Sequence, residues 1–288
     1  MAEYTPMMKQ YLGIKENYKD AILFYRIGDF YEMFFDDAKK ASAALDLVLT
    51  GKNCGQEERA PMCGVPFHSC DNYIAKLVSK GYKVAICEQV EDPAKAKGLV
   101  KRDVIRILTP GTVIENSMLE EGKNNYLACI FRGNGSTGIS FVDVSTGEAQ
   151  VTEVEESEDG EETLNELGRF MPREILVNGQ GKGLKGLQAF TERNEGIYLE
   201  TLPDSDFQLD KAEALITDHF DKPLKDLNLN TENGVKAFGT ALSYLMEVQK
   251  TDLAGIREVN FYTDAKYMKL DFTARRNLEL TETMRNRE

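Results

Sequence analysis

The sequence predicts a mixed α/β protein of two domains, and three patterns support this. Over residues 1–115, helix-like segments of period 3.6 alternate with short apolar runs that are typical of buried strands. A polar stretch at residues 116–125 then interrupts the apolar patterns. From residue 126, three apolar segments separated by glycine-containing turns predict an antiparallel meander, with further helices and strands after it. We therefore expect a first domain at 1–115, a linker at 116–125 and a second domain at 126–260.

The elements of the first domain follow from its apolar periodicity. Residues 22–27 (ILFYRI) are apolar or aromatic apart from Arg26, as in a mostly buried strand, and Gly28-Asp29 ends this run. From Phe34 onward, apolar residues fall on one face of a helix, so residues 30–32 are predicted at a strand-to-helix junction. The expected helices are 6–18, 34–45 and 72–79, and the expected strands are 22–27, 47–50, 83–89 and 104–108, with a turn-rich stretch before the third helix.

The second domain begins with the predicted meander and continues with alternating elements. The expected strands are 127–132, 138–143, 148–154 and 174–177, and the expected helices are 163–170, 211–219 and 234–249. Residues 179–183 (GQGKG) lack the spacing and the hydroxyl of a phosphate-binding loop, so we expect a flexible loop there. Pattern alone indicates only a mixed α/β domain.

Charge is divided unevenly along the chain. The net charge is −13, from 35 Lys/Arg and 48 Asp/Glu. Residues 1–115 hold 16 of each kind, so the excess acidity belongs to the rest of the chain, which includes the acidic run 153–162. A neutral first domain is compatible with contact to a polyanion, whereas the acidic second domain should be held away from one.

Composition points to a cytoplasmic protein without a metal site. No apolar run approaches the length of a membrane span, and the first 11 residues lack the features of a secretory signal. Five cysteines, an odd number, fit a reducing compartment better than a disulfide framework. Cysteines 54, 63 and 70 lie near His68 but have no close Cys-x-x-Cys spacing, so we expect buried thiols and no metal.

The segment GDFYEMF at residues 28–34 carries the clearest functional signal. It places an aromatic ring, Phe30, two residues before a carboxylate, Glu32, where an element begins. Such a ring is usually part of a core and such a glutamate usually favours a helix dipole. An exposed pair, however, could insert a wedge into a base stack and hydrogen-bond the displaced base.

Five sequence blocks in the first domain and two beyond it resemble the bacterial MutS family of DNA mismatch-repair proteins. The blocks are TPMMKQY (5–11), LFYRIGDFYEMFFDDAKKAS (23–42), APMCGVPFH (60–68), VAICEQVEDP (84–93), RILTPGT (106–112), FVDVSTGE (141–148) and LDFTARRNLELTE (270–282). The resemblance covers nearly the whole chain. It implies a mixed α/β mismatch-recognition domain followed by a ribonuclease-H-like α/β connector domain.

The resemblance also implies which residues contact DNA. Phe30 matches the family's minor-groove wedge, and Glu32 matches the carboxylate that hydrogen-bonds the mispaired base. Lys52 matches a basic position near the DNA backbone, and Met62 matches a residue beside the wedge, although an exposed lysine and a core methionine are equally good interpretations. Lys9 could add general attraction to phosphates. Mismatched duplex DNA is the implied ligand, and no catalytic residue is expected.

Two other functions are compatible with parts of the sequence. Asp143, in FVDVSTG, could hold a metal in a ribonuclease-H-like nuclease, but no further carboxylate stands at a convincing place, and an aspartate that caps a hairpin turn is the simpler interpretation. Alternatively, the second domain could be a protein-docking module. The resemblance implies docking of a MutL-type repair partner on the connector, which complements DNA recognition.

The resemblance implies a longer parent protein. Residues 261–288 resemble the start of the family's helical core domain, so we expect a truncated element there. The parent is expected to be a homodimeric, DNA-dependent ATPase that uses ATP and Mg²⁺, whereas this chain is expected to be non-catalytic and without cofactors.

Overall fold

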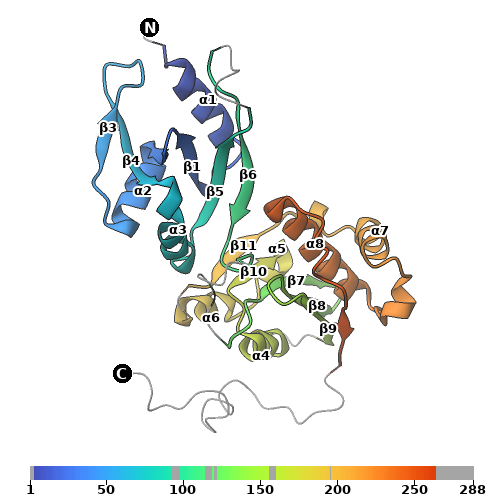
Figure 1. Ribbon diagram of the computed structural model, residues 1–288. Coiled ribbons are helices and arrows are strands. Elements are labelled where there is room, and N and C mark those ends of the chain that lie inside the picture. The colour runs from blue at the N-terminus through green and yellow to red at the C-terminus, as the bar shows by residue number, and fades with distance from the viewer. Residues whose placement is uncertain are drawn as a thin grey trace. The chain divides into compact units, whose positions relative to one another are not determined.

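The computed structural model describes residues 3–91, 98–113, 119, 122–155, 160–194 and 196–263, which form two units (Figure 1). One unit comprises residues 1–123 with 246–252, and the other comprises 124–245 with 253–288. Much of the expected linker, and residues 264–288 of the expected core-domain start, lie outside the described residues. Each unit is described by itself.

The first unit is built on a six-stranded mixed sheet in the order β3-β4-β2-β1-β5-β6. Its helices are α1 (Pro6–Lys15), α2 (Phe35–Leu45) and α3 (Cys70–Ser79), with a short 3-10 turn, η1 (Phe67–Ser69). Its strands are β1 (Ala21–Ile27), β2 (Phe30–Phe34), β3 (Thr50–Lys52), β4 (Ala60–Pro66), β5 (Lys83–Gln89) and β6 (Arg102–Leu108). Strands β1 and β5 are parallel, and the other neighbours are antiparallel. The mixed α/β class is confirmed.

Two strands of this sheet were not predicted. Residues 30–34 form β2 rather than a strand-to-helix junction, because Gly28-Asp29 is a two-residue hairpin turn that pairs Ile27 with Phe30. Residues 60–66, expected to be turn-rich, form β4 between β2 and β3. The strand expected at 47–50 lies instead at Thr50–Lys52.

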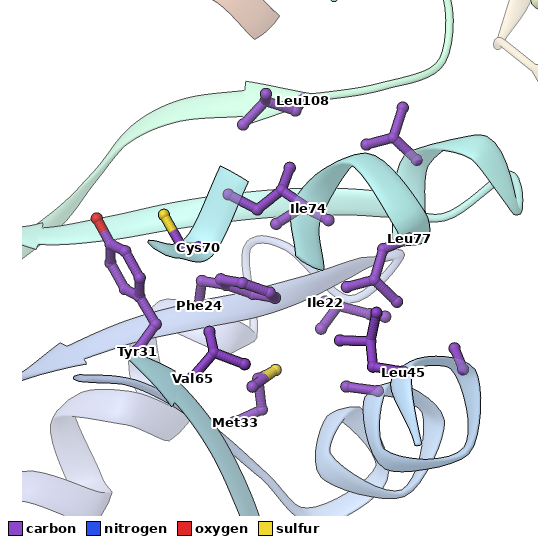
Figure 2. Packing of buried hydrophobic residues seen from close by; sticks show 14 of the residues in the cluster. Ile22, Phe24, Tyr31, Met33, Leu45, Val65, Cys70, Ile74, Leu77 and Leu108 are labelled. Carbon is purple, nitrogen blue, oxygen red and sulfur yellow. The ribbon is translucent and has the colours of Figure 1, made fainter. Parts of the chain in front are cut away.

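The two faces of the sheet carry different helices. Helices α2 and α3 cover the face that holds Ile22, Phe24 and Met33, which are buried with Ile74 and Leu77 of α3 (Figure 2). Helix α1 covers part of the other face. The ring of its Tyr11 lies 4.9 Å from that of Phe34 and 5.5 Å from that of Tyr25, measured between centroids. These contacts of α1 are with β1 and β2, and β3 lies at the edge of the sheet on the far side of β4.

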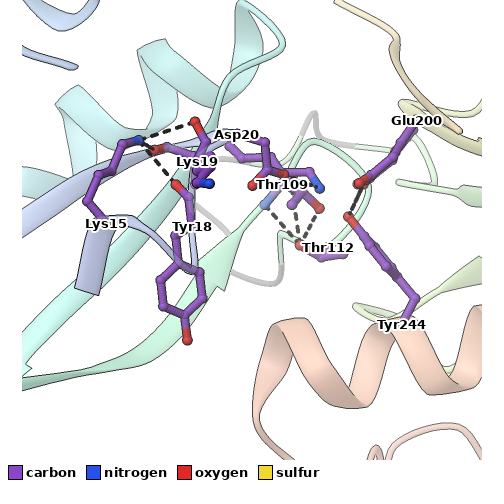
Figure 3. A network of polar contacts seen from close by, with 11 residues as sticks. Lys15, Tyr18, Lys19, Asp20, Thr109, Thr112, Glu200 and Tyr244 are labelled. Atoms are coloured by element: carbon purple, nitrogen blue, oxygen red, sulfur yellow. Dashed lines mark hydrogen bonds and ion pairs between the residues drawn. The ribbon is translucent and has the colours of Figure 1, made fainter. Parts of the chain in front are cut away.

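Polar contacts fix two turns at the ends of elements of this unit. After α1, the ammonium of Lys15 donates to the carbonyl oxygens of Tyr18 at 3.1 Å and Lys19 at 3.4 Å (Figure 3). After β6, the Thr109 amide donates to Thr112 Oγ1 at 3.0 Å, and both threonines are buried. These contacts satisfy backbone groups that helix and sheet ladders leave unpaired.

The second unit has its own six-stranded sheet in the order β11-β10-β7-β8-β9-β12. Its strands are β7 (Leu127–Gly133), β8 (Ser136–Asp143), β9 (Glu148–Glu155), β10 (Glu174–Val177), β11 (Tyr198–Thr201) and β12 (Asn260–Phe261). Strands β7, β8 and β9 form the predicted antiparallel meander, and β10 joins parallel to β7. A three-strand meander extended by parallel strands beside its first member agrees with the ribonuclease-H-like fold that the resemblance implies.

Helices pack on both faces of the second sheet. They are α4 (Glu161–Phe170), α5 (Gly179–Lys182), α6 (Leu187–Arg193), α7 (Leu209–Phe220) and α8 (Glu232–Gln249), with short 3-10 turns η3 (Asp204–Asp206) and η4 (Leu224–Leu227). The start of α8 lies so close to β8 that a Cβ at Gly138 would be 2.0 Å from the carbonyl carbon of Asn233. Residues 179–182 form α5, not the expected flexible loop, because the side chain of Asn178 accepts from the Gly181 amide at 3.0 Å and caps the helix.

Candidate nucleic-acid interface

The β1–β2 hairpin presents Phe30 at the surface. Gly28 has φ +55°, which fits the first position of a two-residue hairpin turn, and Phe30 follows Asp29 as the first residue of β2. Side chains alternate along a strand, so Phe30, Glu32 and Phe34 share one face while Tyr31 and Met33 enter the core. Phe34 is fully buried, but Phe30 is 47% exposed. The uncovered end of this face therefore displays an aromatic ring.

Glu32 lies beside this ring on the same face, and its neighbour across the sheet is a glycine of β4. Its register partner on β4 is Gly64, and a Cβ at Gly64 would come within 3.5 Å of Glu32 Cγ and 3.1 Å of the Tyr31 carbonyl oxygen. An alanine at position 64 would therefore press on the β2 backbone at Tyr31 and touch the Glu32 side chain. The absent side chain leaves room for Glu32 to lie against the sheet.

Lys52 supplies the charge opposite Glu32. Its Nζ lies 2.5 Å from Glu32 Oε2, and the two side chains are only 29% and 15% exposed, respectively. The same Nζ is 5.7 Å from the centroid of the Phe34 ring. The ammonium is thus held over the sheet by the carboxylate and is directed along the face toward β2.

Met62 lies between these residues in the sheet. It is half-buried on β4, where its register partners are Phe34 on β2 and Thr50 on β3. The Thr50 hydroxyl donates to the Met62 carbonyl oxygen at 3.1 Å and lies 3.8 Å from its sulfur. Because cross-strand partners share a face, Phe30, Glu32, Lys52 and Met62 all belong to one face, which we call the wedge face.

Comparison with known proteins identifies both units. The family model for MutS domain I matches residues 5–117, and that for MutS domain II matches residues 125–257. The chain belongs to the MutS family. It is 49% identical over 288 residues to a protein of Ruminiclostridium cellulolyticum and 51% identical over 291 residues to one of Acetivibrio thermocellus, each named "DNA mismatch repair protein MutS". All of this chain is covered in both comparisons, but only 33% of either relative.

MutS domains I and II are the mismatch-recognition and connector parts of the family, which are not catalytic. The first unit is the MutS domain I of this chain, and the wedge face therefore lies in the recognition part. The chain spans about a third of the length of the curated relatives it matches.

Lys9, the fifth predicted contact residue, lies apart from the wedge face in sequence and element. It is on α1, where its ammonium pairs with Glu3 at 2.8 Å, and both side chains are more than half exposed. An exposed pair of this kind contributes little to stability. Lys9 is therefore a surface charge of this MutS domain I.

Sequence reasoning missed the residues that hold the hairpin turn. Arg26 Nε donates to the Gly28 carbonyl oxygen at 2.5 Å, and the Phe67 amide donates to the Asp29 carbonyl oxygen at 2.9 Å. The Arg26 guanidinium also lies 3.5 Å from the centroid of the Phe67 ring. The sequence did contain one sign of this contact: Arg26 is the only charged residue in an otherwise apolar strand of the MutS domain, and a charge in such a strand needs a polar partner.

Glu88 completes this support beneath the turn. Its carboxylate pairs with Arg26 at 3.3 Å and accepts a hydrogen bond from the Tyr31 hydroxyl. Burial, followed by the hydrogen bond to Glu88, raises the pKa of Tyr31, so this hydroxyl remains a donor at neutral pH. Both carbonyls of the turn before Phe30 are thus engaged, and one of the donors is itself fixed by an ion pair.

Asp143 has a structural environment in MutS domain II. It is fully buried, and its carboxylate accepts from the Asn125 amide at 2.9 Å and from the Ser145 amide and hydroxyl at 2.9 and 2.6 Å. Within the described part of the chain, no three His, Cys, Asp or Glu side chains are grouped to hold a metal ion. The nuclease alternative is not favoured, because the carboxylate is already occupied by hydrogen bonds that shape a turn.

The cysteines and the helices add two further findings. Cys63 and Cys70 are buried free thiols, as expected, and Cys54 is a buried free thiol as well. Of the helices in the described ranges, none has the length and apolar character needed to cross a membrane.

Proposed function

We propose that this chain binds duplex DNA and recognises mispaired or unpaired bases for mismatch repair. In this proposal Phe30 inserts from the minor groove and stacks on the mispaired base, and Glu32 hydrogen-bonds that base. The observation that carries the proposal is the half-exposed ring of Phe30 on the same face as Glu32, at the tip of a braced hairpin. Membership of the MutS family supports it.

The wedge would read DNA through its deformability. An inserted apolar side chain unstacks a base step and kinks the duplex, which costs a few kcal/mol at a paired step. The cost is lower where pairing has already failed. A protein that places a rigid ring against the minor groove therefore prefers lesions without contacting a particular base sequence.

Replacement of Phe30 by alanine tests the wedge directly. We expect Phe30→Ala to remove the preference for mismatched over perfectly paired duplex and to leave weak general binding, because phosphate contacts do not depend on the ring. The measurement is equilibrium binding of the full-length protein, at a fixed salt concentration, to two duplexes that differ at one base pair.

A matched control is available on β6, an edge strand of the same sheet. Ile105 on β6 is 49% exposed, close to the exposure of Phe30, so Ile105→Ala removes a similarly exposed apolar side chain. The control should keep the wild-type preference. Equal discrimination by Phe30→Ala and wild type would refute the wedge.

Properties of the whole protein are part of the proposal and rest on the family alone. We propose that the longer protein hydrolyses ATP with Mg²⁺, forms a homodimer and binds a MutL-type partner through domain II. A chain extended to the length of the curated relatives, assayed for ATP hydrolysis with and without duplex DNA, would test the first of these.

A further inference from the structure

We propose that Lys52 is the counter-ion that controls Glu32. It holds the carboxylate against the sheet in the free protein and on perfect duplex, and it releases the carboxylate when a mispaired base competes for it. Lys52 then becomes free to meet a phosphate. This inference rests on the proposed function and assigns Lys52 a role in specificity that a plain backbone contact would not have.

The register shows how far Lys52 must reach. Its partner on β4 is Ala60, whereas the partner of Glu32 on the same strand is Gly64, so the pair crosses β4 diagonally. The contact forms nevertheless, with Nζ 2.5 Å from Oε2. A lysine that only had to contact a phosphate would have no need to extend across a strand toward this carboxylate.

Burial distinguishes this pair from ordinary surface pairs of the same unit. The side chains of Lys52 and Glu32 are 29% and 15% exposed, whereas those of Lys39 and Asp36 on α2 are 59% and 82% exposed. Water and salt screen a half-buried pair less than an exposed one. Removal of one partner therefore leaves the other charge with a larger penalty than a surface charge would have.

The position of the pair explains why its charge matters on DNA. An unpaired carboxylate on the wedge face would be repelled by phosphates on any duplex, whereas a carboxylate paired with an ammonium approaches DNA as a neutral unit. Only an unpaired base edge offers Glu32 a new hydrogen-bond donor at close range. We therefore expect an exchange of partners at a mismatch and no exchange on perfect duplex.

Salt dependence separates this role from a simple phosphate contact. Each phosphate neutralised by a cationic side chain contributes a slope of about −0.9 to log K against log salt on B-DNA. If Lys52 stays with Glu32 on perfect duplex, it releases no counterion there, so Lys52→Met changes the slope for that duplex by much less than about 0.9, through the screened repulsion of the unpaired carboxylate alone. In the Glu32→Gln background the ammonium is released, and Lys52→Met then makes the slope shallower by about 0.9.

The experiment is a double-mutant cycle in the protein as its gene encodes it. Wild type, Lys52→Met, Glu32→Gln and the double variant are titrated with perfect and mismatched duplexes at several salt concentrations. We expect Lys52→Met to weaken binding to perfect duplex when Glu32 is present, Glu32→Gln to strengthen it, and the two changes to be non-additive by about fivefold or more. On mismatched duplex, Lys52→Met should make the slope shallower by about 0.9 with Glu32 present.

Two control variants isolate the charge pair. Lys52→Arg keeps a cation opposite Glu32 and should restore both the affinities and the slopes of the wild type. Lys39→Met removes one positive charge from an exposed pair on α2 of the same unit. It should show no coupling to Glu32→Gln.

A measurement without DNA checks the pair itself. Thermal unfolding of the four proteins should show that Lys52→Met lowers the melting temperature more when Glu32 is present than in the Glu32→Gln background, because only in the first case is a half-buried carboxylate left unpaired. Equal shifts in the two backgrounds would overturn the counter-ion role.

The outcomes on DNA separate this inference from the proposed function. Additive effects within about twofold, with a slope that is shallower by about 0.9 in both backgrounds on perfect duplex, would show that Lys52 acts at a phosphate alone and would overturn this inference only. A wild-type protein that does not distinguish mismatched from perfect duplex would overturn the proposed function and this inference together.

Discussion

Gly64 and Asp143 each shape a neighbouring segment through one local feature. At Gly64 the feature is an absent side chain, because a Cβ would stand 3.1 Å from the carbonyl oxygen of Tyr31. At Asp143 it is a buried carboxylate that accepts hydrogen bonds from three backbone amides and a hydroxyl. Both residues act on the positions of their neighbours.

Replacement of Asp143 by alanine should destabilise the second unit. The change removes the buried carboxylate that accepts from the amides of Asn125 and Ser145, and hydrogen bonds to a charged group are the costly ones to lose. We expect the free energy of unfolding to fall by about 3 kcal/mol, measured by urea denaturation.

The exposed carboxylate of Asp218 on α7 gives the control for this prediction. Asp218→Ala should change the free energy of unfolding by less than about 0.5 kcal/mol. Full stability of Asp143→Ala, together with loss of a Mg²⁺-dependent cleavage of DNA, would instead support the nuclease alternative.

Among the elements, the β1–β2 hairpin has the most direct consequence for the site. Its two-residue turn sets the register Ile27–Phe30, and this register decides which side chains of β2 face the core. A shift by one residue would bury Phe30 and expose Tyr31. The turn is therefore as important to the wedge face as the ring it precedes.

Gly28→Ala should weaken this hairpin through backbone strain alone. Gly28 has φ +55° and no atom within 4 Å of an added Cβ, so the substitution introduces a disfavoured backbone conformation without a clash. We expect a loss of about 1–2 kcal/mol in the free energy of unfolding, measured by denaturant titration.

Gly13 on α1 is the matched control, because an added Cβ there also meets nothing within 4 Å but the backbone is helical. Gly13→Ala should raise stability by up to about 1 kcal/mol. Similar effects of the two alanines would show that the turn does not need glycine.

Local periodicity was enough to predict most of the elements but not the hairpin strand. Strands 83–89 and 174–177 were predicted with their observed bounds, since continuous apolar runs mark buried strands. β2 was missed because its five residues run directly into α2, so residues 30–32 were interpreted as a strand-to-helix junction. The Gly28-Asp29 pair, read as a hairpin turn, would have corrected this.

The other missed strand depends on distant partners. β4 contains two prolines and a glycine in seven residues, which is typical of a turn, yet it pairs with both β2 and β3. Position 61, a proline, has Gly51 of the three-residue edge strand β3 as its register partner. No window of sequence contains this pairing, so its prediction needs the folded sheet.

The site was predictable in part. Phe30 and Glu32 could be singled out by residue type and spacing, and the resemblance indicated Lys52 and Met62. The structure adds the contact between Lys52 and Glu32, which joins residues 20 positions apart through a strand that was not predicted. The brace by Arg26 and Phe67 depends on the same missing strand order.

For the molecule as a whole, charge and function divide between the same two parts. Residues 1–115 carry equal numbers of acidic and basic side chains, and the excess of acidic residues lies in the remainder. The wedge face belongs to the neutral part. Under the proposed function, this division favours contact of DNA with the first unit, because that unit carries no net charge that would repel phosphates.

Stability should decline at alkaline pH because the first unit buries several thiols. Burial raises the pKa of Cys63 and of Cys70 from 9.0 to about 11, and that of Cys87 to about 12. The folded state thus retains protons that the unfolded state loses. Stability from this source is fully present below pH 9 and is lost as pH rises toward 11 to 12, which urea denaturation across this range will measure.

Cys63→Ala provides the internal comparison. Removal of one titrating thiol should make the decline between pH 9 and 11 shallower by up to about 1.4 kcal/mol per pH unit, with no change of slope at neutral pH. An identical alkaline slope in wild type and variant would contradict the assignment to Cys63.

The anchoring of both turn carbonyls ahead of Phe30 has a mechanical consequence. Arg26 donates to the carbonyl oxygen of Gly28, and the Phe67 amide donates to that of Asp29. These hydrogen bonds fix the backbone of the turn that carries the ring. If the tip enters a groove as proposed, it has little freedom left to lose, so the elastic resistance of the double helix would be the dominant barrier. A tip of this kind would respond to how easily each site along DNA is deformed.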